Sequence, residues 1–403
     1  MVTLRRALSR RQFLQIVGAA ALGASAGCQS SLVPTASPTF PPPPTLTLAP
    51  STSTPAAVVE TGAEVTATST ASVPWDPDAQ VCIAQQATYE RKALRACLQE
   101  MLEDLGGLSG GETPILPRGA KVAIKVNLTG GVSAHHLDGA PAIETIATHP
   151  EVVRALGELL LDAGASQLFI VEAVYEWQSY TEWGYEEIAK SLNATLIDLN
   201  DAKPYAGFTT LPVGPGALIY QEFTVNPILA EVDTFISAAK MKCHIECGVT
   251  HSLKNLVGMV PYPLYRVKNS DGTRSAFHED SKSRLPRIVV DLNMARPIHL
   301  ALIDGIKTIE AGEGSWAQNA RQVAPGLLIA SRDPVAADSA ATAIMGFDPT
   351  ARYPAAPFTR ADNYLNIAYN LDLGTNLLDK IEILGPTIEA VRFPFAPATG
   401  YKS

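Results

Sequence analysis

The sequence has few cysteines and no surplus of basic residues. Five cysteines in 403 residues are too few for a fold built on disulfide bonds. Lysine and arginine number 31 against 40 aspartate and glutamate residues, which gives a formal net charge of −9. Nucleic-acid-binding proteins normally carry a basic surplus, so this balance excludes that class. The 46% hydrophobic and 18% charged residues are typical of a globular protein.

The N-terminal segment lacks an apolar run long enough to cross a membrane. Its apolar stretch, from Phe13 to Ala26, is shorter than the about 20 residues that span a bilayer. The sequence SRRQFLQ, with the pair Arg10 and Arg11, stands at its start. A basic start, a short apolar centre and a small-residue exit are the three parts of a removable signal peptide, which we predict over residues 1–28.

This signal resembles the twin-arginine export signal, and the resemblance implies passage of a folded protein through the twin-arginine export machinery. Cys28 follows Ser-Ala-Gly, and small residues before a single cysteine resemble a lipoprotein processing site. We therefore expect a lipid anchor on Cys28 and a location on the outer face of the cytoplasmic membrane, in the periplasm or at the cell surface. The alternative is a plain signal peptide that is cleaved nearby.

A spacer without basic residues follows the signal. Residues 29–74 contain nine Pro, seven Ser and ten Thr, and only two glutamates carry charge. Such a segment buries too little apolar surface to offset the entropy lost on ordering. We predict a disordered tether over residues 29–75. The chain beyond residue 28 has a formal net charge of −13, because the first 28 residues hold four arginines and no acidic residue.

Residues 76–403 alternate between strand and helix patterns. Helices of ten to fifteen residues between buried strands predict an α/β fold, with parallel or mixed sheets, flanking helices and two lobes. Pro150 suits the start of a helix that Gly164 ends, and Asp333 suits an N-cap. Strands are expected over 121–128, 167–171, 195–199, 233–239, 299–304 and 327–330, with further helices over 182–192, 286–294 and 334–345.

The densest group of chemically active residues is KMKCHIECGVTHSLKNLVG, residues 240–258, directly after the strand FISAA. Ligands of α/β proteins bind at the carboxyl ends of strands. In an extended chain Lys240, Lys242 and His244 share one face. A helix from Thr250 would bring three further side chains within one turn and add an N-terminal anion site. We predict an anion-binding site formed by Lys240, Lys242, His244, His251, Lys254 and Asn255.

Two other groups extend this prediction. Lys125 and Asn127 lie on one face of the first strand, at its end, and we assign them to the same site. Cys243 and Cys247 are separated by three residues, a spacing that fits neither a standard zinc nor a ferredoxin pattern. A metal or redox role and a structural role both stay open for this cysteine pair.

The order of the segments resembles the domain-of-unknown-function 362 family over about residues 122–349. Many members carry ferredoxin-like cysteine clusters, which this chain lacks, so no iron–sulfur cluster is expected. The matching stretches are KVAIKVNL, THPEVVRALGELLLDAGA, VDTFISAAKMKCH, GVTHSLKNLVGMVP, DLNMARPIHLALIDGI and ASRDPVAADSAATAIMGFDP.

The ten-residue separation of His244 and Lys254 around a turn after a strand is similar to the nickel-pincer lactate racemase family. This resemblance implies His244 as a catalytic acid/base, Lys254 as the catalytic residue that holds a cofactor covalently, and His278 as a nickel ligand. The racemases have Ser-Gly-Gly before their lysine, whereas this chain has His-Ser-Leu.

Two functions account for both the spacer and the basic cluster, whereas a third, a structural cell-envelope protein, accounts for the spacer alone. The first is an exported enzyme that acts on a small anionic substrate with a metal or a covalently held cofactor, as racemases and isomerases do. The second is a lipid-tethered protein that binds a small anionic ligand without catalysis.

Overall fold

A computed structural model describes residues 79–402, apart from residues 112–113, 133–136, 138 and 269–273. The predicted signal peptide and tether, with Arg10, Arg11 and Cys28, lie outside the described residues. The described residues form one compact unit.

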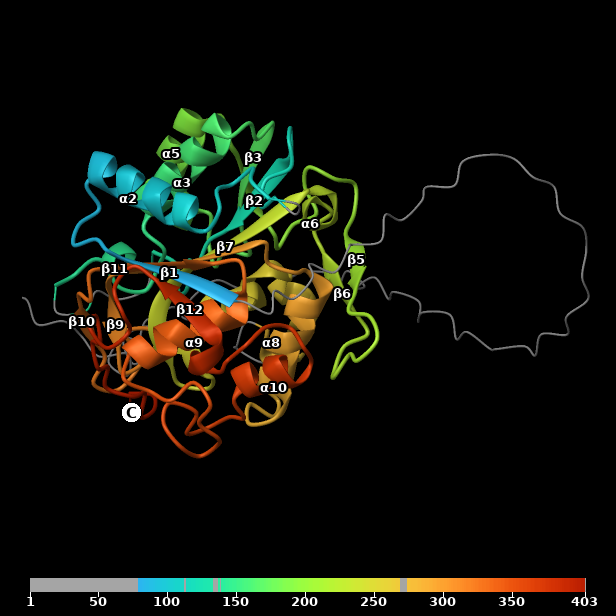
Figure 1. The fold of residues 1–403 in the computed structure, drawn as a ribbon. Coiled ribbons are helices and arrows are strands. Elements are labelled where there is room, and N and C mark those ends of the chain that lie inside the picture. Colours follow the sequence, from blue (N-terminus) through green and yellow to red (C-terminus); the bar gives the residue numbers. More distant parts are fainter. Residues whose placement is uncertain (1–78, 112–113, 133–136, 138, 269–273, 403) are drawn as a thin grey trace, which may run out of the picture. The chain divides into compact units, whose positions relative to one another are not determined.

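One large mixed sheet forms the centre of the described part (Figure 1). Its strands follow the order β12-β1-β11-β9-β7-β2-β3-β4, while β8 pairs with β7 and β10 with β9. The run β9-β7-β2-β3-β4 is parallel, and β11 is antiparallel to both β9 and β1. The strands of this sheet are β1 (Ala79–Gln85), β2 (Lys121–Lys125), β3 (Gln167–Glu172), β4 (Thr195–Asp198), β7 (Thr234–His244), β8 (Gly248–Thr250), β9 (Leu300–Glu310), β10 (Arg321–Val323), β11 (Leu327–Ser331) and β12 (Ile381–Leu384).

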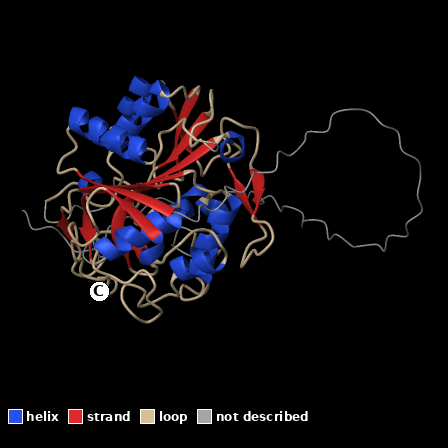
Figure 2. Ribbon diagram, in the orientation of Figure 1, coloured by secondary structure: helices blue, strands red, loops and turns tan. Residues whose placement is uncertain are grey.

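Helices cover both faces of the sheet (Figure 2), so its strands are apolar on both sides. In β2, Val122 and Ile124 enter the core under α2, α3 and α5, while Ala123 enters the opposite core under α8, α9 and α10. The helices are α2 (Arg91–Asp104), α3 (Pro150–Asp162), α4 (Gln178–Glu182), α5 (Tyr185–Leu192), α6 (Ile228–Glu231), α7 (Ser252–Asn255), α8 (Arg284–Ala295), α9 (Pro334–Ile344) and α10 (Tyr364–Asn370). A separate hairpin joins β5 (Thr209–Pro212) to β6 (Glu222–Val225).

Local sequence signals account for the ends of two long helices. Pro150 stands in the first turn of α3, and Gly164, just beyond its last residue, has a positive φ of 96°. The carboxylate of Asp333 accepts hydrogen bonds from the backbone N–H groups of Val335 and Ala336, at 2.8 and 2.9 Å, and so caps α9. No helix of the described segments is long and apolar enough to cross a membrane.

The predicted α/β class, with a mostly parallel sheet and flanking helices, is confirmed. The strand predicted over 233–239 continues to His244, because β8 and β9 supply partners for its second half. The division into two lobes stays a prediction, since one sheet runs through the described residues with a core on each face.

Candidate functional site

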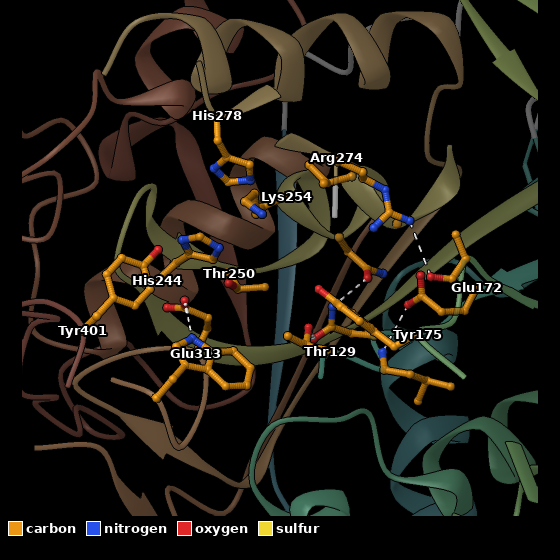
Figure 3. Close-up of a pocket in the computed structure, with 17 residues that line it drawn as sticks. Thr129, Glu172, Tyr175, His244, Thr250, Lys254, Arg274, His278, Glu313 and Tyr401 are labelled. Carbon is orange, nitrogen blue, oxygen red and sulfur yellow. Dashed lines mark hydrogen bonds between the residues drawn. The ribbon is translucent and has the colours of Figure 1, made fainter. Parts of the chain in front are cut away.

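A cavity of about 260 Å³ opens where β2, β3 and β7 end (Figure 3). The carboxyl ends of parallel strands meet at this edge, the usual position of ligand sites in α/β sheets. Five side chains predicted from sequence line it: Asn127, His244, Lys254, Asn255 and His278. The other lining residues are Leu128, Thr129, Glu172, Ala173, Tyr175, Thr250, Val257, Gly258, Arg274, Glu313, Trp316 and Tyr401.

Lys254 brings an uncommitted ammonium group to the cavity. The residue is only 8% exposed, and no described residue offers a hydrogen-bond acceptor or a salt-bridge partner to its Nζ. Burial lowers the pKa of Lys254, against the opposing effect of Cys247 and Glu313. A buried cation without a paired carboxylate is unfavourable by itself, and a bound anion would remove this cost.

His244, the last residue of β7, has one of its two ring nitrogens already engaged. Its Nδ1 accepts hydrogen bonds from the backbone N–H groups of Glu246, at 3.1 Å, and Cys247, at 3.2 Å. Burial, together with the charges of Lys254 and His278, lowers the pKa of His244 well below its usual range. The neutral ring therefore carries its hydrogen on Nε2, which is left as a donor for a ligand.

Arg274 is a second buried cation in the cavity wall, and the sequence did not single it out. Its Nε and Nη2 donate to the carbonyl oxygen of Val260, at 3.1 and 3.0 Å. Within the described ranges no carboxylate forms a salt bridge with it. Its φ of 49° lies in the left-handed region, which is uncommon for a residue with a side chain. No local sequence pattern indicates this position.

Glu172 and Glu313 are the carboxylates that line the cavity. Oε2 of Glu172 accepts from Lys125 Nζ, at 3.0 Å, and from the N–H of Leu128, at 3.1 Å. Glu313 accepts from the N–H of Ile245, at 2.8 Å, and from Nε1 of Trp316, at 2.9 Å. Glu172 directly follows the predicted strand QLFIV, so the strand-end rule could have found it. Glu313 has no comparable sequence signal.

Lys125 lies under the cavity and not in its wall. Its fully buried Nζ donates to Glu172 and, at 3.2 Å, to Oδ1 of Asn255. Burial lowers the pKa of Lys125 to about 8, although Glu172 acts in the opposite direction. Asn127 Nδ2 also donates to Oδ1 of Asn255, at 3.2 Å. This network holds the two asparagines in the cavity floor, so Lys125 acts as a positioning residue.

Gly258 closes over this network, and we expect Gly258→Ala to destabilise the protein. A Cβ at this position would overlap Glu172 Oε1 and Lys125 Nζ, and a buried hydrogen bond from Lys125 Nζ to the other carboxylate oxygen, Oε2, holds both side chains in place. Overpacking of this kind costs about 1–3 kcal/mol, which chemical denaturation would measure. Gly207→Ala is the matched control, because a Cβ on Gly207 meets nothing within 4 Å. Equal stability of the two variants would contradict the overlap.

Lys240 and Lys242 were predicted to bind the anion, but neither of them lines the cavity. Lys240 is fully buried beside Asp304, with 2.7 Å from its Nζ to Oδ2, and does not reach the cavity. A register shift in β7 between the two lysines separates their environments. Lys242 Nζ donates to Thr129 Oγ1, at 3.2 Å, and to the carbonyl of Ile146, at 2.5 Å. Lys242 therefore lies behind the cavity wall.

The N–H groups at the start of α7 are not free to form the predicted anion site. The helix begins at Ser252, and the carboxylate of Asp338 accepts hydrogen bonds from the N–H groups of Ser252 and Leu253, at 2.8 and 3.0 Å. A carboxylate of the chain itself thus occupies the place of an external anion. His251 is fully buried outside the cavity, and neither ring nitrogen has a hydrogen-bond partner among the described residues. It is not available to a ligand in the cavity.

Cys243 and Cys247 are buried and not in a disulfide. Burial raises the pKa of Cys247 to about 12 and that of Cys243 further, so both are protonated thiols of low reactivity. In the described ranges, no three His, Cys, Asp or Glu side chains are arranged to hold a metal ion.

One comparison with known proteins identifies a family without an assigned activity. A family model described as "Domain of unknown function (DUF362)" matches residues 122–343. A thylakoid-associated protein from Synechocystis sp. is 28% identical over 271 residues, which cover 67% of this chain and 75% of the relative. A crystal structure from Thermotoga maritima shares 14% identity over 57% of this chain and 54% of its own, with a TM-score of 0.30, too low to support an argument. The similarity to lactate racemases stays a prediction.

Proposed function

The chain belongs to the DUF362 family of domains of unknown function, and from this premise we propose that its cavity binds a small anionic ligand. The observation that carries the proposal is the ammonium group of Lys254, which lies in the cavity wall without a carboxylate partner among the described residues. Arg274 adds a second cation of the same kind. A carboxylate or phosphate group would pair with both.

His244 serves this ligand as a hydrogen-bond donor. Since Nδ1 accepts two backbone hydrogen bonds, Nε2–H is the group that meets a bound oxygen atom. This proposal replaces the proton-accepting role that the racemase resemblance implied for His244. A neutral donor beside a cation also stabilises negative charge that develops on a ligand during a reaction.

The test is thermal unfolding of the full chain in sulfate, phosphate, acetate and nitrate, with chloride as the reference salt at equal ionic strength. Ligands that bind only the folded state stabilise it by RT ln(1 + [L]/Kd), about 2.7 kcal/mol at a hundred times the Kd. We expect a saturable rise in Tm of several degrees with at least one anion. The same Tm in all salts would overturn the proposal.

Catalysis on the bound anion remains the first functional hypothesis, and binding without turnover is the second. The hydrogen on Nε2 of His244 favours the second, because the ring cannot accept a proton there. Glu172 Oε1, which accepts no hydrogen bond from a described residue, is the group that favours the first. Incubating the protein with succinate in D₂O separates the two, because deuterium incorporation seen by NMR would require a catalytic base.

We also propose that the chain is exported and anchored to a membrane by a lipid on Cys28. The sequence pattern around Arg10 and Arg11 supports export, and the Synechocystis relative is described as thylakoid-associated. These three residues lie outside the described part of the chain.

Replacing Arg10 and Arg11 together by lysine is expected to block export, since the arginine pair is what the twin-arginine machinery would read. Cell fractionation should then find the unprocessed chain in the cytoplasm. The control replaces Arg5 and Arg6 by lysine, which leaves the total charge and the pair at 10–11 unchanged. Normal export of the Arg10/Arg11 variant would contradict the proposed export through the twin-arginine machinery.

A further inference from the structure

Resting on the proposed anion site, we infer that the ligand is a compact dianion, with two negative charges on one small group. The inference comes from the balance of buried charges at the cavity. Some charged side chains line the cavity, and others hydrogen-bond directly to a lining side chain. Among the described residues these are the cations Lys125, Lys242, Lys254 and Arg274 and the carboxylates Glu172 and Glu313, together with the pair Glu246–Arg360 at Tyr401.

Two pairs of these charges cancel locally. Lys125 and Glu172 form a salt bridge at 3.0 Å. Glu246 and Arg360, at 3.5 Å, cancel in the same way at the cavity mouth. When Lys242 is protonated, Glu313 alone opposes Lys242, Lys254 and Arg274, so the described part of the site then has an excess of two positive charges. Charges on buried side chains are screened less than charges in water, and the excess therefore favours a doubly charged ligand.

Lys242 supplies the additional positive charge that favours a dianion over a monoanion. Its fully buried Nζ donates only to neutral groups, Thr129 Oγ1 and the carbonyl of Ile146, and no described carboxylate lies within salt-bridge distance. Lys240, two residues earlier in the same strand, has Asp304 as its partner. The difference is informative because a buried lysine normally has a carboxylate or becomes neutral.

The donors that face the cavity also exceed what a single carboxylate can use. Lys254 Nζ and the Nε2–H of His244 lie on one side of the cavity with Thr250, and Arg274 lies across it (Figure 3). Thr250 is 3% exposed and its Oγ1 has no hydrogen-bond partner in the described part of the chain. A tetrahedral group with three terminal oxygens, or a pair of neighbouring carboxylates, provides enough acceptors for these donors.

The experiment measures binding of sulfate, malonate, nitrate and acetate to the full chain by isothermal titration calorimetry at constant ionic strength. Sulfate and nitrate keep their charges of two and one at every pH used. We expect sulfate or malonate to bind at least tenfold more tightly than nitrate and acetate. A preference for sulfate identifies a phosphate-like group, and a preference for malonate identifies a dicarboxylate.

The outcomes separate the two levels of the proposal. If none of the four anions binds, the proposed function itself fails. If nitrate and acetate bind as tightly as the divalent anions, anion binding stands and the dianion inference is overturned.

The variant Lys242→Met removes one excess charge without changing the cavity lining. We expect it to reduce the preference for sulfate over nitrate to threefold or less. The control is Lys190→Met, on the exposed face of α5, which changes the total charge equally and should leave the preference intact. An unchanged preference in Lys242→Met, with the variant folded, would overturn the inference.

Proton uptake tests the same inference in the unaltered protein. Burial lowers the pKa of Lys242 to about 7, with the charges of Lys240 and Lys254 acting in the same direction. Glu313 and Glu172 act in the opposite direction. A dianion stabilises the charged form, so its binding at pH 8 should take up a substantial fraction of one proton. Titrations in buffers of different ionisation enthalpy measure this uptake, and its absence would count against the dianion.

Discussion

The Lys254→Met variant is expected to bind its anion at least 100-fold more weakly than the unaltered chain. Removing one partner of a buried charge pair typically costs 2–5 kcal/mol of binding free energy, and each 1.4 kcal/mol is about tenfold in affinity. Methionine fills a similar volume without the charge. Because Nζ of Lys254 has no acceptor among the described residues, its loss leaves no described group unpaired. Calorimetric titration with sulfate measures the change.

Stability and binding should separate in this variant. The folded state loses a desolvated charge, so the Tm without ligand should stay the same or rise. The matched control is Lys92→Met, an exposed lysine in the first turn of α2, which should alter neither quantity. Affinity within threefold of the unaltered protein would show that the ammonium group of Lys254 does not hold the ligand.

The second large effect concerns stability, and we expect Asp304→Ala to lower the free energy of unfolding by about 3–5 kcal/mol. Asp304 is fully buried and accepts hydrogen bonds from Lys240 Nζ, at 2.7 Å, and from the N–H of His149, at 3.0 Å. The hydroxyl of Tyr89 donates to it as well, at 3.0 Å. Without Asp304, the ammonium group of Lys240 is buried with no carboxylate partner. Urea denaturation at pH 7 measures the loss.

A surface ion pair provides the comparison for this loss. Arg287 and Asp362 pair at 2.9 Å with both side chains about one-third exposed. Exposed pairs of this kind contribute about 0–1 kcal/mol, so Asp362→Ala should have a small effect. Similar losses in Asp304→Ala and Asp362→Ala would mean that burial does not strengthen the Lys240–Asp304 interaction.

The sequence predicts the cavity residues that follow β2 or belong to β7 and the turn after it, which are Asn127, His244, Lys254 and Asn255. His244 and Lys254 come from one segment, and the rule that ligands bind at strand ends places both. Arg274, Glu313 and Tyr401 reach the cavity from distant loops, and their positions depend on long-range packing that no local pattern records. The sequence thus predicts part of one wall of the cavity.

The wrong prediction for Lys240 has a similar cause. Alternation along a strand puts Lys240 on the face of Lys242, but it does not say which residue of the neighbouring strand lies opposite. In the structure, Lys240 of β7 is in register with Asp304 of β9. Lys240 directly follows one predicted strand and Asp304 ends another, and their ion pair can be predicted only once the register of β7 and β9 is known.

The pairing of β1 sets the time at which the chain can finish folding. In the sheet, β1 contacts β11 and β12, and Gln80 in β1 bonds Glu382 in β12 across 302 positions of sequence. At about 5–20 residues per second of synthesis, roughly 15–60 s pass before β1 can meet these strands. Until then the backbone N–H and C=O groups of β1 are unpaired and can pair with strands of other chains. The nascent chain therefore needs protection from aggregation in the compartment where it is made. Folding that is complete only after synthesis of the last strand is compatible with a secretion route that accepts only completed, folded proteins.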